Sequence, residues 1–153
     1  MKRIACPLIA LAAALLAPQA HAAACAVVGI GPVAFGAYDP FAIRAADSAG
    51  DVAFRCTGVA ADDRLRIELD FGRSASGAQR RLRSFAGTLD YQLYLDSART
   101  QVWGDGAGGT NTWTSGALSD GVDVHVPVYG RIRAGQNVPA GAYADTITVT
   151  VEF

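Results

Sequence analysis

The chain has 153 residues with 13 basic and 14 acidic side chains, which is a net charge of −1 and a length suited to one domain. Such a near-neutral balance gives no general electrostatic attraction to nucleic acid or to anionic membranes, so we expect no nucleic-acid partner. Without Lys2 and Arg3 the net charge is −3, and every remaining basic residue is arginine.

The N-terminal residues have the pattern of an export signal. Two basic residues precede a charge-free apolar run over residues 4–17, which is too short to span a bilayer. Small residues follow, and the pattern predicts a secretory signal peptide over residues 1–24, cleaved after Ala22 or Ala24. The mature domain is then expected over residues 25–153, with no integral membrane segment.

Two cysteines, Cys25 and Cys56, remain after cleavage. In an oxidising compartment the simplest outcome is a disulfide between them, which stabilises by roughly 3–4 kcal/mol in the chain-entropy model. The alternative is a lipoprotein in which Cys25 is the acylated first residue, since three alanines precede it. The sequence lacks the large aliphatic residue usual three positions before such a cysteine, and acylation would leave Cys56 as a free thiol.

Alternation of apolar and polar residues dominates the mature chain, which is the period of half-buried β-strands. An opening extended stretch covers residues 26–35, where Gly29, Gly31 and Pro32 must bend or interrupt it. The alternating segments that follow are 51–57, 64–71, 89–96, 122–129 and 146–153. Residues typical of turns occur at 39–40, 48–50, 72–77, 104–109 and 139–141. These patterns predict an all-β sandwich or barrel.

The last of these segments alternates up to residue 153. A strand at an open sheet edge is a template for the addition of a strand from another chain. The alternative is an ordinary strand that is paired on both sides within the domain. Periodicity alone leaves both interpretations open.

Several short blocks occur in a characteristic order along the mature chain. They are VAFGAYDP at 33–40, CT at 56–57, LDYQLY at 89–94, VWGDG at 102–106, VYGRI at 128–132, a glutamine at 136, and PAGAYADTITVT at 139–150. With these blocks the chain resembles the spore coat protein U family, which includes subunits of archaic, Csu-type chaperone–usher pili. The resemblance implies an incomplete immunoglobulin-like β-sandwich that lacks its final strand.

The same resemblance implies a structural assembly subunit, exported to the periplasm and then to the pilus or coat at the surface of a Gram-negative bacterium. Its implied partners are a periplasmic pilus chaperone, an outer-membrane usher and other pilin-like subunits. A strand donated by a chaperone or a neighbouring subunit would enter an open hydrophobic groove. By this analogy the groove residues are Val27, Val33, Phe35, Ile147, Val149, Val151 and Phe153.

One feature departs from the family pattern. Subunits that donate a strand carry an N-terminal extension before their first cysteine, whereas the predicted mature chain starts at Cys25 or just before it. We therefore expect a subunit that accepts a strand and donates none.

Residue patterns for catalysis are weak. His125 lies close to Asp123, and Ser115 or Ser119 could formally complete a Ser–His–Asp catalytic triad. No nucleophile-elbow motif supports such a triad. The remaining carboxylate candidates, Asp62 with Asp63 and Asp96 with Asp105, are in sequences that turn geometry alone would select. The glycine-rich segment 104–109 lacks both the repeated carboxylates of a calcium loop and a phosphate-binding lysine. We expect no enzymatic activity, no metal and no cofactor.

Two features suggest surface binding. Arg80, Arg81 and Arg83 form a basic cluster in a predicted loop, where they could contact acidic polysaccharide or a partner's carboxylates, although a solvated loop is the simpler interpretation. Trp113 lies among polar residues in another predicted loop and is a candidate for sugar contact. These residues support the alternative function, a self-contained secreted adhesin or glycan-binding module.

Overall fold

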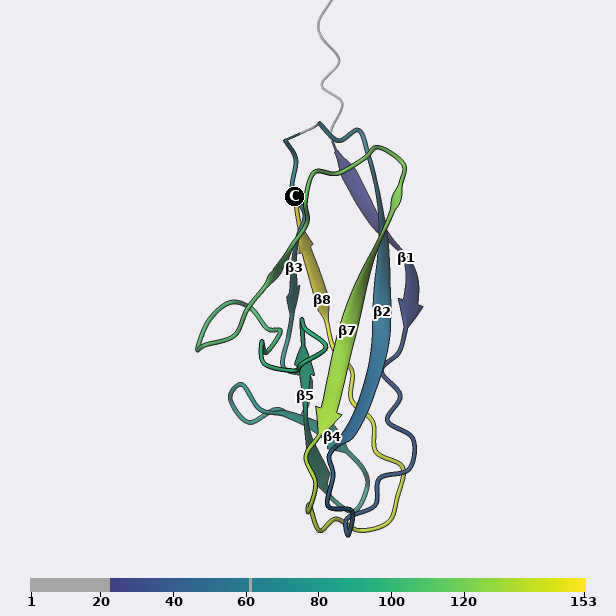
Figure 1. Ribbon diagram of the computed structural model, residues 1–153, viewed down its shortest axis with the longest axis vertical. Coiled ribbons are helices and arrows are strands. Elements are labelled where there is room, and N and C mark those ends of the chain that lie inside the picture. The colour runs from purple at the N-terminus through teal and green to yellow at the C-terminus, as the bar shows by residue number, and fades with distance from the viewer. Residues whose placement is uncertain (1–22, 61) are drawn as a thin grey trace, which may run out of the picture.

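The computed structural model describes residues 23–60 and 62–153, which form eight β-strands and, over this part of the chain, no helix (Figure 1). Accordingly, no helix of the described residues could cross a membrane. The strands are β1 (Ala24–Gly31), β2 (Ala46–Thr57), β3 (Arg66–Leu69), β4 (Arg80–Arg83), β5 (Thr88–Tyr94), β6 (Trp113–Thr114), β7 (Asp123–Ile132) and β8 (Val149–Glu152). The all-β class predicted from the alternation is confirmed. The predicted signal peptide lies, apart from its last two residues, outside the described residues.

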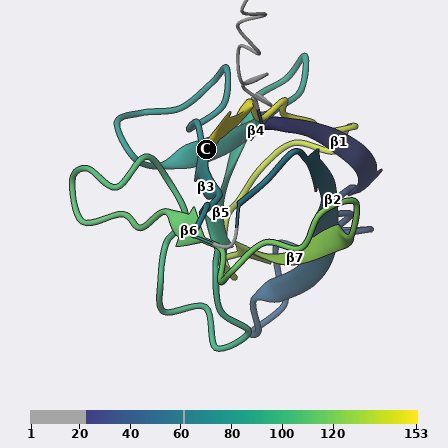
Figure 2. The same cartoon turned by 90° about the horizontal axis from the view of Figure 1, so that it is seen from above.

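Two antiparallel sheets form a sandwich. One has five strands in the order β1-β2-β7-β5-β4, and the other has three in the order β6-β3-β8. Figure 2 shows the five-stranded sheet curving from β1 through β2 to β7. The end strands β1 (purple) and β8 (yellow) lie on the same side of the molecule in this view.

The core forms between the two sheets from the inward positions of the predicted strands. Its buried side chains include Val52, Phe54, Cys56, Leu65, Ile67, Leu69, Leu89, Tyr91, Leu93, Val126 and Val128. Trp103 is also fully buried, and its indole Nε1 donates a hydrogen bond to the Ile67 carbonyl oxygen at 3.0 Å. Full burial of one such side chain stabilises by about 1.5–3 kcal/mol, so this cluster is the main source of stability.

The predicted turn at residues 48–50 is wrong, because these residues lie inside β2 and pair with β7. Gly50 is required for a close approach of two backbone segments and not for a turn. A Cβ atom at this position would collide with the Gly31 carbonyl oxygen and lie 2.9 Å from the Pro32 carbonyl carbon. Glycine therefore lets the chain that leaves β1 pass directly against β2.

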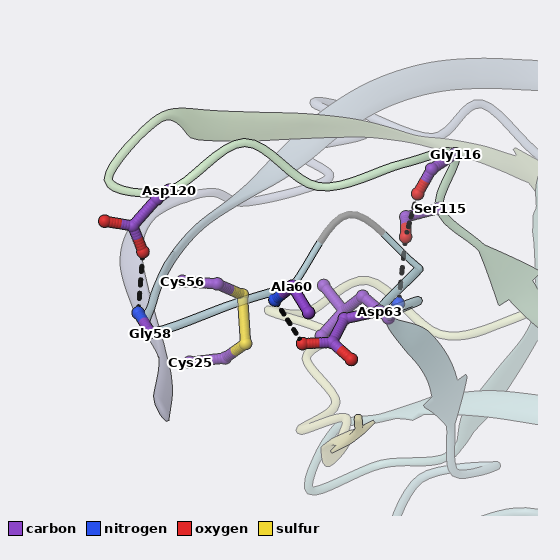
Figure 3. The surroundings of a disulfide bond; sticks show 9 residues. Cys25, Cys56, Gly58, Ala60, Asp63, Ser115, Gly116 and Asp120 are labelled. Carbon is purple, nitrogen blue, oxygen red and sulfur yellow. Dashed lines mark hydrogen bonds between the residues drawn. A yellow bond between two sulfur atoms is a disulfide. The ribbon is translucent and has the colours of Figure 1, made fainter. Parts of the chain in front are cut away.

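The Cys25–Cys56 disulfide is present, with an S–S distance of 2.06 Å (Figure 3). The two cysteines are directly opposite one another in the β1–β2 ladder, so strand pairing itself brings them together. Next to the bridge, the Gly58 amide donates to the Asp120 carboxylate at 2.6 Å. These links fasten the beginning of β1 and the end of β2 to the connection that precedes β7.

Candidate strand-acceptor groove

The edge strand β1 carries apolar side chains that face the core side of its sheet but are not covered. Val27 is opposite Phe54 and Ile30 is opposite Val52, with a bulge between Val27 and Gly29. Directly opposed residues of an antiparallel pair point to the same face of the sheet. Phe54 and Val52 are buried, yet Val27 is 45% exposed and Ile30 is 70% exposed. The sandwich therefore lacks a layer over β1.

At the other end strand, β8, the inward side chains pack against the buried residues of β3. Val151 is opposite Ile67 and Val149 is opposite Leu69, and both partners are buried. Val149, Val151 and the preceding Ile147 are partly buried and pack against the core cluster. The predicted inward direction is correct for Ile147, Val149 and Val151, although the regular strand is shorter than predicted and Phe153 lies after it.

Both strands have one unpaired edge. Among the described residues, β1 pairs only with β2, and β8 pairs only with β3. An unpaired edge presents backbone N–H and C=O groups that can hydrogen-bond to a further strand. The two free edges belong to different sheets and lie on the same side of the sandwich (Figure 2).

A cavity of about 730 Å³ continues this open side of the molecule. Its walls are residues 33–38 and Pro40, which follow β1, and residues 138–145, which precede β8. Leu82, Leu89 and Ile132 from the five-stranded sheet also line it. Space for apolar groups is thus left between the chain leaving one edge strand and the chain entering the other.

The predicted groove residues Val33 and Phe35 line this cavity and pack across β7. A Cβ atom added to Gly130 would lie 2.7 Å from the Phe35 ring, so the glycine permits the close contact. Phe35 also meets the Tyr91 ring edge-on, with 6.0 Å between the ring centroids. This packing fixes one wall of the cavity on the sheet beneath it.

Hydrogen bonds position the other wall. The Tyr91 hydroxyl donates to Asp145 Oδ2 at 2.9 Å, and the Asp145 carboxylate also accepts from the Thr146 amide. Burial, followed by this hydrogen bond to the carboxylate, raises the pKa of Tyr91, so the phenol stays protonated and remains a donor. Nearby, the Thr148 amide donates to Asp70 Oδ1 at 2.9 Å. The segment that enters β8 is thereby held to both sheets.

The sequence reasoning missed two residues of this region. Ile30 is the most exposed of the core-facing residues of β1, but the bulge shifts the alternation, so counting by two from Val27 does not reach it. Gly29 was the available signal, since a glycine inside a strand often marks a bulge. Asp145 positions the cavity wall, and no local pattern distinguishes it from a turn residue. Phe153, which was predicted to line the groove, is 61% exposed.

Comparison with known proteins identifies the family. The Spore Coat Protein U domain family matches residues 11–150 of the chain. The chain belongs to this family. The resemblance inferred from the ordered blocks is therefore confirmed.

Two individual proteins are similar to this spore coat protein U domain. Protein U of Myxococcus xanthus is 34% identical over an alignment of 138 residues, and the match covers 82% of this chain and 73% of that protein. A chain in the crystal structure of the CsuC–CsuE chaperone–tip adhesion subunit pre-assembly complex, from the archaic chaperone–usher Csu pili of Acinetobacter baumannii, has a TM-score of 0.54 at 23% identity. The match covers 86% of the present chain but only 40% of that chain. This likeness supports the immunoglobulin-like fold.

The spore coat protein U domain does not present the basic cluster predicted at Arg80, Arg81 and Arg83. Arg80 is fully buried in β4, donates to the Asp70 carbonyl oxygen at 3.0 Å, and donates to Gln92 Oε1 at 2.7 Å. Burial lowers the pKa of its guanidinium. The prediction of a surface role is wrong for Arg80, because its charge is used to satisfy buried oxygen atoms. Arg81 forms an ion pair with Asp90 at 3.0 Å.

Trp113 is likewise placed differently from the prediction. It belongs to β6 and is opposite Ile67, so its ring lies on the core side, where it is partly buried against the core cluster. The predicted solvent-facing loop at this position is wrong. Cross-strand pairing with β3 provides the apolar partner that its polar sequence neighbours do not.

Three further polar candidates, Asp96, Asp105 and His125, form local hydrogen bonds or an ion pair. Backbone donors of their own turns lower the pKa of Asp96, which accepts from the Gln101 amide, and that of Asp105, which accepts from the Ala107 amide. His125 is exposed and lies 3.3 Å from Asp51 Oδ2 on the outer face of the sheet. In the described part of the chain, no group of three or more histidine, cysteine, aspartate or glutamate residues is arranged to hold a metal ion.

Proposed function

We propose that this spore coat protein U domain is an exported structural subunit of a surface pilus or coat, and that it accepts a β-strand from a periplasmic chaperone or a neighbouring subunit. The observation that carries the proposal is the exposure of Val27 and Ile30, which face the core side of β1 and have no layer above them. Apolar side chains that face water on the inner side of a sandwich lower its stability, and a further strand would bury them.

The free edges of β1 and β8 supply the second requirement. A strand placed between them would satisfy backbone groups through main-chain hydrogen bonds, while its alternate side chains covered Val27 and Ile30 and entered the cavity beside Phe35. The occupant is therefore an extended segment with apolar residues at every second position. Acidic residues at those positions would be disfavoured, because the cavity lining is mostly apolar and its charged group is the carboxylate of Asp145.

Several observations are consistent with this assembly role. The predicted signal peptide over residues 1–24 provides export, and the Cys25–Cys56 disulfide suits an oxidising compartment such as the periplasm. The similar Acinetobacter structure is a chaperone–subunit complex of a chaperone–usher pilus. A periplasmic chaperone, an outer-membrane usher and other subunits are accordingly the partners that we propose for this chain.

The test is to supply the strand. The full chain is fused through a flexible linker to a short segment that alternates valine and threonine, and the matched control carries aspartate in place of each valine. We expect the valine fusion to raise the thermal midpoint on the order of 10 °C and to protect the amides of β1 and β8 from hydrogen exchange. Equal midpoints for the two fusions, or unchanged exchange at both edges, would refute the proposal.

A further inference from the structure

A second surface pocket lies apart from the acceptor groove, between the β3–β4 connection and the β4–β5 turn. Its volume is about 420 Å³, which is within the range of about 300–1,000 Å³ usual for small-ligand sites. It is lined by Arg73, Ser74, Arg83, Ser84, Phe85 and the following residues 86–88. None of these residues lines the larger cavity.

The two arginines of this pocket differ from most others in the chain. Arg55, Arg66, Arg81, Arg99 and Arg131 each form an ion pair with a carboxylate. Among the described residues, no carboxylate pairs with the exposed side chains of Arg73 or Arg83. Two guanidinium groups that share a pocket without an internal partner favour an external anion.

Hydrogen bonds fix the main chain of both arginines. The Arg73 amide donates to Asp145 Oδ1 at 3.2 Å, while Arg83 exchanges two backbone hydrogen bonds with Ala144, at 2.8 and 3.0 Å. Both are thus fastened to the same segment, the one that enters β8. The adjoining turn is closed as well, because Ser84 Oγ accepts from the Ala86 and Gly87 amides at 3.1 Å. A site with an ordered backbone loses less entropy when it binds a ligand.

Phe85 adds an apolar surface beside the two charges. Its relative exposure is 109%, so the ring rests on no other side chain. The hydroxyl-bearing residues Ser74 and Thr88 also line the pocket. Together these groups match a ligand that combines a carboxylate, several hydroxyl groups and one apolar ring face. A uronic acid unit of a polysaccharide has this combination, and guanidinium groups bind carboxylates through paired hydrogen bonds.

We propose that this pocket binds a carboxylated sugar of an acidic polysaccharide, with Arg73 and Arg83 on the carboxylate and Phe85 against the ring. Nucleic acid is disfavoured, because the chain has a net charge of −1. The site would let an assembled subunit contact an anionic extracellular matrix.

The test uses the exported chain purified from the periplasm and calorimetric titration with a galacturonic acid trimer, a neutral galactose trimer and inorganic phosphate. We expect saturable binding of the acidic trimer only, weakened by added salt. Replacing either pocket arginine (Arg73→Gln or Arg83→Gln) should weaken binding about tenfold, and Phe85→Ala should weaken it several-fold.

Matched controls are Arg44→Gln and Phe41→Ala, which remove the same groups from the exposed β1–β2 connection and should leave binding unchanged. Equal binding of the neutral trimer, or losses in these controls as large as in the pocket variants, would overturn the assignment. If inorganic phosphate binds as tightly as the acidic trimer, the pocket is a general anion site and the sugar assignment is overturned. If the acidic trimer does not bind, the sugar assignment is likewise overturned.

Discussion

Ile30 provides a quantitative test of the acceptor groove. Its side chain faces the core side of β1 but is 70% exposed. Replacing isoleucine with alanine removes about three carbon groups, each of which contributes about 0.8 kcal/mol when fully buried. In the chain alone, where about a third of the residue is covered, Ile30→Ala should cost roughly 0.7 kcal/mol.

In a chain that carries a linked donor strand, the same residue should be covered. The full loss of roughly 2.4 kcal/mol then applies, so the two forms should differ by about 1.7 kcal/mol in the effect of Ile30→Ala. Changes in β-propensity occur in both forms and cancel in this difference.

The assay is urea denaturation of four proteins, wild type and Ile30→Ala, each with and without the valine–threonine strand. Ile43→Ala is the control, because Ile43 is 94% exposed in the β1–β2 connection and outside the groove lining. It should cost the same small amount in both forms. If Ile30→Ala costs the same with and without the strand, the strand does not cover β1 and the reasoning is refuted.

Three further predictions concern stability. Reduction of the disulfide should lower the free energy of unfolding by about 3–4 kcal/mol, measured by urea denaturation with and without reductant. Arg80→Met should destabilise by roughly 2–3 kcal/mol in thermal unfolding, because it leaves buried oxygen atoms unpaired, whereas Arg83→Met on the exposed end of β4 should cost less than about 0.5 kcal/mol. The hydrogen bond and charge of Arg131 hold the pKa of Asp47 below its ordinary value of 3.8, so its contribution should be present above that pH and disappear as the pH falls through the lower folded value. Unfolding free energies between pH 2 and 7 should show a smaller acid loss in Asp47→Asn.

Each of these predictions has an outcome that contradicts it. Unchanged stability after reduction would mean that the bridge does not constrain the unfolded chain. A tolerated Arg80→Met would show that the buried carbonyl groups find other donors. An acid transition of the same depth in Asp47→Asn would assign the pH dependence to other carboxylates, such as Asp123, whose pKa the Arg55 hydrogen bond also lowers.

Local pattern was a reliable guide to inward positions. Leu65, Ile67 and Leu69 were predicted to face the core and are buried, because alternation is a property of a strand's own backbone geometry. The same reasoning failed at Gly50 and Arg80. Gly50 resembles a turn glycine, and Arg80 resembles a surface charge, until the chain segments that lie against them are known.

The sequence alone was sufficient for the all-β class, the cysteine pair and the family, since these depend on composition, periodicity and ordered motifs. Only the tertiary structure decided which inward side chains stay uncovered, as at Ile30, and which arginines stay unpaired, as at Arg73 and Arg83. Burial and charge pairing are set by residues that are distant in the sequence. The alternation within a strand predicts which way a side chain points, whereas the tertiary structure determines whether another residue covers that side chain.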